Sequence, residues 1–203
     1  MVSEYTRRIL IFSCIFSLFL LLGCDDEAGK GRIYGTLFLP DCVEGKARDF
    51  TCPPTISLNE CRAFELGVDF FALQVYPDHS ATLRLQRGGS DFAITDGVIF
   101  QLRDTRKLRG RLGEPVPVGV GENVRAGLGL FDLCPGSTQN FDLTGSMTFD
   151  KFGVESDDQI KGRIELLEVR DGRGEGAGEV LGNLKGYFEF KVVTGPPYQR
   201  FQE

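Results

Sequence analysis

The sequence predicts an all-β fold, a single antiparallel β-sandwich of about eight to ten strands that is strongly curved or barrel-like. Apolar residues alternate with other residues through most of the chain after residue 31, and this period of two is typical of strands. No segment in that part shows a convincing helical pattern. Glycine makes up 26 of the 203 residues, nearly twice the usual share of about 7%, and it punctuates the segments as turns do.

The alternation also places individual strands. The clearest segments are residues 33–39, 83–85, 98–102, 141–149 and 184–192. Turn residues between further segments predict two hairpins. Residues 70–76 and 81–87 flank a short polar connection, and residues 159–170 and 180–193 flank a longer glycine-rich tip.

Two irregular features modify these strands. The alternation changes phase between Phe70 and Phe71 and again between Leu166 and Leu167, and we expect a β-bulge at each place. In several strands a glycine takes the second position of the apolar face, as Gly35, Gly145, Gly162 and Gly186 do, with Gly110 in a shorter case. We expect these glycines on one inward layer, where large neighbours such as Phe188 cover the bare backbone. A chance placement in a glycine-rich chain is the alternative.

The first 24 residues form a charged and apolar leader. Two arginines precede an apolar run over residues 9–22, which is shorter than the roughly 20 residues that a transmembrane helix needs. Leu21, Gly23 and Cys24 end the run. This arrangement resembles the cleavage site of a bacterial lipoprotein signal peptide, and the resemblance implies that residues 1–23 are removed.

The resemblance also implies how the chain is organised and where it resides. Cys24 receives lipid, both a diacylglyceryl group and an acyl chain such as palmitate, and residues 24–31 serve as a short tether. Residues 32–203 then form the single folded domain, held at the periplasmic or outer membrane face of a bacterial cell envelope. The inner and the outer membrane both remain open as the anchoring site. A secreted protein without lipid is the alternative.

The charge of the chain limits its partners. The formal net charge is -6, and removal of two arginines and one glutamate with residues 1–23 leaves 21 basic and 28 acidic residues, a charge of -7. An acidic surface argues against nucleic acid as a partner and against electrostatic adhesion to anionic lipid. Membrane attachment is therefore expected through the lipid on Cys24. We expect no cofactor.

Four cysteines remain after the leader and Cys24, namely Cys42, Cys52, Cys61 and Cys134. An even number in an exported chain predicts two disulfides, and three pairings are possible. We favour one bridge between Cys42 and Cys52 and another between Cys61 and Cys134. The bridges would pin an irregular excursion over residues 40–62, which either presents a binding surface or compensates for missing hydrogen-bonded structure. A metal site is disfavoured, because no Cys-x-x-Cys spacing occurs and the chain has one histidine.

Five positive charges gather within nine residues, as Arg103, Arg106, Lys107, Arg109 and Arg111. Guanidinium groups bind oxyanions in pairs, so this cluster is a candidate site for a phosphate-bearing envelope component or an acidic partner. A solvated strand face and hairpin tip, or an edge protected by charge, is the alternative.

An acidic loop is a second candidate site. Asp150, Glu155, Asp157 and Asp158 fall between two predicted strands, and carboxylate oxygens are the ligands that Ca2+ prefers. The spacing matches no EF-hand loop, so a solvated acidic turn is the favoured interpretation.

These observations together indicate a non-catalytic protein. The single histidine, His79, lies in a predicted turn and no Gly-x-Ser-x-Gly motif occurs, which argues against a hydrolase triad. We expect a binding or scaffolding domain whose partner is an envelope protein or a glycan. A small-ligand or carbohydrate carrier is one alternative and would need a deep apolar pocket. A carboxylate-based hydrolase is another and would need two acids in one cleft.

Overall fold

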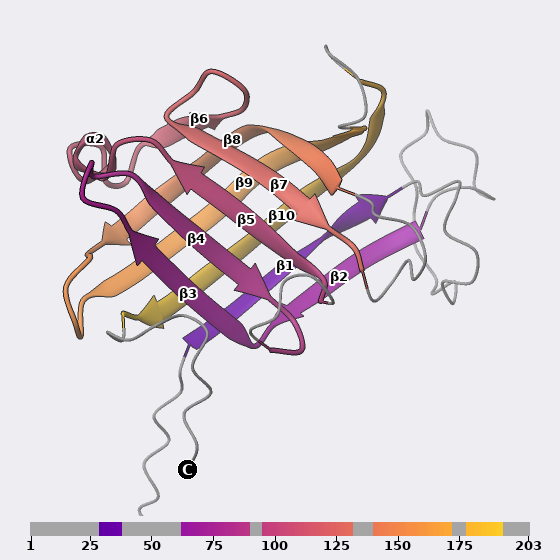
Figure 1. Ribbon diagram of the computed structural model, residues 1–203. Coiled ribbons are helices and arrows are strands. Elements are labelled where there is room, and N and C mark those ends of the chain that lie inside the picture. Colours follow the sequence, from indigo (N-terminus) through magenta and orange to yellow (C-terminus); the bar gives the residue numbers. More distant parts are fainter. Residues whose placement is uncertain (1–28, 38–61, 90–94, 132–139, 172–177, 193–203) are drawn as a thin grey trace, which may run out of the picture.

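Ten strands form one mixed sheet that is nearly closed into a barrel (Figure 1). This computed structural model describes residues 29–37, 62–89, 95–131, 140–171 and 178–192. The all-β prediction is confirmed, and so is the expected strong curvature. In the described part of the chain, no helix has the length and apolar character needed to cross a membrane.

The elements follow one another along the chain with one short helix among the strands. They are β1 (Gly29–Leu37), β2 (Arg62–Val68), β3 (Phe70–Val75), β4 (Ala81–Gln86), β5 (Gly97–Leu102), α2 (Thr105–Arg109), β6 (Pro115–Val118), β7 (Val124–Gly129), β8 (Asn140–Phe152), β9 (Gln159–Asp171) and β10 (Val180–Lys191). Their order in the sheet is β2-β1-β10-β9-β8-β6-β7-β5-β4-β3. Both predicted hairpins are confirmed, because β3 pairs with β4 and β9 pairs with β10.

The strands belong to one continuous sheet rather than to two separate ones. In Figure 1, β3, β4, β5 and β7 lie in front of β1, β2, β9 and β10, and β8 links the two layers by pairing with both β7 and β9. The expectation of purely antiparallel pairing needs one correction. Strand β6 runs parallel to β7 where Val118 pairs with Val124. Pro115 and Pro117 have no N–H to donate, and β6 meets β7 only through that last residue.

The two ends of the sheet come together at Asp69 without pairing with each other. Strands β2 and β3 are the two ends of the sheet, yet Asp69 alone separates them in the chain. Its backbone N–H donates to the carbonyl of Gln86 at 3.0 Å, and its carboxylate accepts from the N–H of Gly88 at 2.8 Å. The ring of Phe71 stacks on Phe190 of β10 with the centroids 5.1 Å apart. These contacts fix Asp69 against the end of β4 and pack β3 against β10, on the side where the sheet comes nearest to closing.

The phase change at Phe70 has a different cause from the one predicted. Strand β3 pairs with β4 without a register shift, so the bulge expected between Phe70 and Phe71 is wrong. The alternation breaks there because one strand ends and the next begins at Asp69.

The second predicted bulge is present. The register between β8 and β9 shifts from Ser146 opposite Leu166 to Met147 opposite Ile164. Glu165 and Leu166 are both exposed as a result, since an extra residue turns the following side chains to the other face. The irregularity lies one residue earlier than the sequence indicated.

Aromatic rings fill the centre of the barrel. Phe100, Phe149 and Phe188 are at most 1% exposed, and the Phe149 and Phe188 rings meet edge to face at a centroid distance of 6.1 Å. Gly162 is buried beneath the Phe188 ring, as the glycine pattern predicts. The single inward layer is not complete, because Gly145 is exposed and Gly110 follows helix α2 rather than lying in a strand.

Candidate functional site

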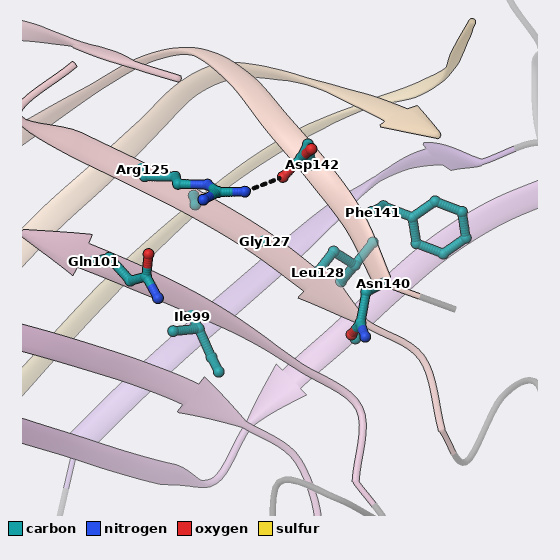
Figure 2. Close-up of a pocket in the computed structure, with 10 residues that line it drawn as sticks. Ile99, Gln101, Arg125, Gly127, Leu128, Asn140, Phe141 and Asp142 are labelled. Carbon is teal, nitrogen blue, oxygen red and sulfur yellow. Dashed lines mark hydrogen bonds and ion pairs between the residues drawn. The ribbon is translucent and has the colours of Figure 1, made fainter. Parts of the chain in front are cut away.

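A shallow pocket of about 330 Å³ lies on the outer face of the sheet across β5, β7 and β8 (Figure 2). The lining includes residues whose side chains point away from the core, together with core residues that lie beneath them. The lining is Ile99, Gln101, Arg125, Ala126, Gly127, Leu128, Gly129, Asn140, Phe141 and Asp142. We refer to this pocket as the β7 trough.

The sequence of β7 produces the trough. Val124, Ala126 and Leu128 point inward and are buried, so Arg125, Gly127 and Gly129 take the outward positions. Two of those three outward positions have no side chain.

The strand register determines the walls of the trough. Gly127 lies between Ile99 of β5 and Asp142 of β8 in one cross-strand row. Gly129 lies next to Asn140 of β8 in the following row. Two strand spacings separate β5 from β8, which is roughly 9–10 Å. The absence of side chains on β7 at these two positions therefore leaves space between the side chains of β5 and β8.

An ion pair borders the trough. The Nη2 atom of Arg125 donates to Oδ1 of Asp142 at 3.3 Å, and the two side chains are 49% and 36% exposed. Figure 2 shows Gln101 and Ile99 on the side of β5 and Asn140 and Asp142 on the side of β8. Within the described part of the chain, the side-chain amides of Gln101 and Asn140 have no hydrogen-bond partner in the protein.

Among the described residues, the lining of the trough lacks the groups that two common hydrolytic mechanisms use. Asp142 is the one carboxylate in that described lining, and glycoside hydrolysis by the common mechanism needs two. The same described lining contains no serine, cysteine or histidine that would act as a nucleophile or base. What the trough offers is a set of hydrogen-bonding groups around a bare backbone floor.

The predicted basic cluster lies on and around helix α2, where we had expected a strand face or hairpin tip. The Asp104 carboxylate caps the helix by accepting from the N–H of Arg106 at 3.0 Å. Thr105 and Leu108 are buried three positions apart, which is the spacing of one helical face. The expectation that this part of the chain contains no helix is therefore wrong at α2. The N-cap aspartate and this spacing were signals that the sequence analysis missed, because the helix is only five residues long.

The five cations of the cluster do not converge on one site. Arg103 donates to the carbonyl of Gly121 at 2.9 Å, Arg106 binds Asp104, and Arg111 donates to Glu114 at 3.3 Å and to the carbonyl of Pro115 at 3.0 Å. The exposed Lys107 and Arg109 have no such partner among the described residues. Three of the five side chains therefore serve local structure.

The ion pair at the helix start perturbs the pKa of both partners. The hydrogen bond from the Arg106 side chain holds the pKa of the Asp104 carboxyl below its ordinary value. The same hydrogen bond raises the pKa of Arg106. Both shifts favour the charged forms, and the hydrogen bonds between the two side chains place Arg106 beside the helix N-terminus.

The acidic loop uses two of its carboxylates within the protein. Asp150 accepts two hydrogen bonds from Arg163, at 3.1 and 3.2 Å. Asp158 accepts from the N–H groups of Val154 and Glu155 at 3.0 and 2.9 Å. In the described ranges, no group of three or more His, Cys, Asp or Glu side chains is arranged to hold a metal ion.

The cysteine predictions lie outside the described residues. This holds for lipidation of Cys24, for the pairing of Cys42, Cys52, Cys61 and Cys134, and for the excursion over residues 40–62. They stay predictions.

Comparison of the chain with protein-family models, with curated proteins and with solved structures gave no match. The functional argument therefore depends on the site itself. The sequence prediction did not include the trough, although the alternation of Val124, Ala126, Leu128 and Leu130 around Gly127 and Gly129 was a sequence signal for a strand with a bare outer face.

Proposed function

We propose that this chain is a lipid-anchored protein of the bacterial cell envelope whose β domain binds a partner without catalysing a reaction. The leader up to Cys24 supports the anchor. The position of the β7 trough on the outside of the sheet supports the binding role. A site on the outer face is accessible without any opening of the barrel.

The observation that carries the binding role is that aromatic side chains fill the interior of the barrel, whereas the β7 trough lies on its outer face. A carrier of the internal-pocket type would need the space that Phe100, Phe149 and Phe188 occupy. A carboxylate-based hydrolase would need a second acid beside Asp142, and the described residues of the trough lining include none. Both alternatives are therefore less favoured than a non-catalytic binding surface.

The remaining fold predictions form part of this proposal. Disulfides between Cys42 and Cys52 and between Cys61 and Cys134 would pin the segment over residues 40–62, which joins β1 to β2. An oxidising compartment outside the cytoplasm, where lipoproteins reside, permits such bridges.

Metabolic labelling with radioactive palmitate tests the anchor. The full-length chain expressed in a bacterial host is expected to take up label and to sediment with membranes. Cys24→Ala is expected to abolish the label, whereas Cys14→Ala, a change within the leader, is expected to keep it. Equal labelling of Cys24→Ala and the unchanged chain would contradict the anchor.

Site-specific photo-crosslinking tests the binding role. A photoreactive amino acid replaces Gln101 in the trough or, as the control, Tyr187, which is 45% exposed on β10. Irradiation of intact cells is expected to give a discrete product from position 101 and none from position 187. The same products from both positions, or no product from position 101, would contradict a role for the trough.

A further inference from the structure

We propose that the β7 trough binds one or two neutral sugar units of an envelope glycan. This inference rests on the proposed function, since it names the ligand class for the same site. The size of the trough, the hydrogen-bonding groups on its walls and their charge balance all favour such a ligand.

The trough is small. Its volume of about 330 Å³ lies at the lower end of the range of about 300–1,000 Å³ for small-molecule sites. Gly127 and Gly129 contribute only backbone to its floor. A pyranose ring has matching dimensions and a flat face, so the trough suits one or two rings rather than a large cofactor.

The walls suit hydroxyl groups. A hydroxyl both donates and accepts hydrogen bonds, as the side-chain amides of Gln101 and Asn140 also do. Arg125 adds donors and Asp142 adds acceptors, and both are partly exposed. Each of these planar amide, guanidinium and carboxylate groups has at least two polar atoms, so that one group can bind two adjacent hydroxyls at once. A sugar would therefore meet hydrogen-bond donors and acceptors on both sides of the trough.

The charges favour a neutral ligand. Arg125 and Asp142 pair at 3.3 Å, so the two charges largely cancel for a third charged group nearby. A phosphate or carboxylate drawn to Arg125 would also meet the negative charge of Asp142. A cation drawn to Asp142 would be repelled by the positive charge of Arg125. A neutral polyol gains from both side chains without this repulsion.

The same lining is poorly suited to a protein partner. Protein interfaces depend on buried aromatic or large apolar anchors, and among the outward side chains of the trough only Ile99 is aliphatic. Ile99 is half-buried beside Gly127 and provides an apolar surface for the C–H face of one sugar ring. A peptide ligand is therefore the less favoured occupant and becomes an outcome of the test.

The chain offers a matched pair of variants for this test. A Cβ atom at Gly127 would meet only the carbonyl oxygen of Phe141, at an ordinary 3.5 Å. Gly127→Val therefore fills the trough while suiting a strand. Gly67→Val is the control, since Gly67 is exposed on β2 and nothing lies within 4 Å of an added Cβ.

Saturation-transfer NMR on the full-length chain, held in a detergent without sugar groups, measures binding directly. The probes are neutral disaccharides of glucose, mannose and N-acetylglucosamine, tested up to about 10 mM because a shallow site is expected to bind with a Kd of about 1 mM. At least one probe is expected to receive saturation. Gly127→Val is expected to weaken that binding at least about tenfold, and Gly67→Val to leave it unchanged.

Two further probes complete the test. A disaccharide of uronic acid is expected to bind more weakly than its neutral counterpart, and a tripeptide is expected not to bind. No transfer to any neutral disaccharide, binding that persists in Gly127→Val, or preference for the uronic acid or the peptide would overturn the glycan inference. Palmitate labelling and the crosslinked product from position 101 test the proposed function separately. A failure of the glycan inference can therefore be distinguished from a failure of the proposed function.

Discussion

The ring of Phe188 on β10 lies over Gly162, its cross-strand partner on β9. Both residues are buried. A side chain at position 162 would occupy the space of the ring, so the glycine allows Phe188 to fold down onto the sheet and reach Phe149 and Phe100. This aromatic cover of a strand glycine is how the barrel fills its centre, and it is consistent with a proposed binding surface on the outside.

Gly162→Ala tests this relationship. The added Cβ would overlap Cζ of Phe188 and lie 2.9 Å from its Cε1, so we expect a loss of about 1–3 kcal/mol in the free energy of unfolding, as overpacking usually costs. Urea denaturation measures the loss. Gly67→Ala, where an added Cβ meets nothing within 4 Å, is expected to change the stability by less than about 1 kcal/mol. Equal effects of the two changes would contradict the packing role of Gly162.

Gly145→Ala tests the bulge in β9. Gly145 has a φ of +149°, and an added Cβ would overlap the carbonyl oxygen of Leu166 in the bulge. Gly121→Ala is the control, because Gly121 has a φ of +91° but nothing within 4 Å of an added Cβ. We expect a loss of about 1–2 kcal/mol from the backbone conformation in the control and a larger loss at position 145. Thermal unfolding compares the two variants, and a smaller loss at position 145 would contradict the close approach.

The start of helix α2 gives a pH dependence. The hydrogen bond from Arg106 lowers the pKa of Asp104 below its ordinary 3.8, so the charged carboxylate stabilises the folded state. A depressed folded pKa adds stability that is complete above the unfolded value and is lost as the pH falls through the folded value. The stability difference between the unchanged chain and Asp104→Asn is therefore expected to shrink as the pH falls below 3.8.

NMR titration of the Asp104 carboxyl measures the pKa itself. Arg106→Gln is expected to move this pKa back towards 3.8, and Lys107→Gln to move it much less, because Lys107 is the weakest of the causes. A larger shift from Lys107→Gln than from Arg106→Gln would contradict the assigned ion pair.

The cysteines give a prediction about stability in reducing conditions. Non-reducing peptide mapping of the purified chain is expected to show Cys42 joined to Cys52 and Cys61 joined to Cys134. Reduction is expected to cost about 2–5 kcal/mol, as loss of native disulfides does in small exported domains. Four free thiols in the untreated protein would contradict the pairing and the oxidising location together.

Local pattern was enough to predict much of the fold. The hairpin of β3 and β4 and the pair of β9 and β10 follow from alternation and turn residues. The bulge near Leu166 follows from a change of phase within one strand. Each of these features depends on residues that are close in the sequence. Their apolar side chains alternate because every second one must face the core.

Features that depend on distant strands were not predicted. The ring of Phe71 near Asp69 stacks on Phe190, which lies more than a hundred positions further along the chain. The trough depends on the register that sets Gly127 between Ile99 and Asp142. Strand order and register are set by packing across the whole sheet, and alternation within one segment does not specify them.

Mass spectrometry of the N-terminal peptide from the membrane fraction tests the central claim most directly. The account predicts a mature chain that begins at Cys24 and carries a diacylglyceryl group and an acyl chain on that residue. A peptide with an unmodified Cys24, or one in which residues 1–23 remain attached, would contradict the anchored envelope protein proposed here.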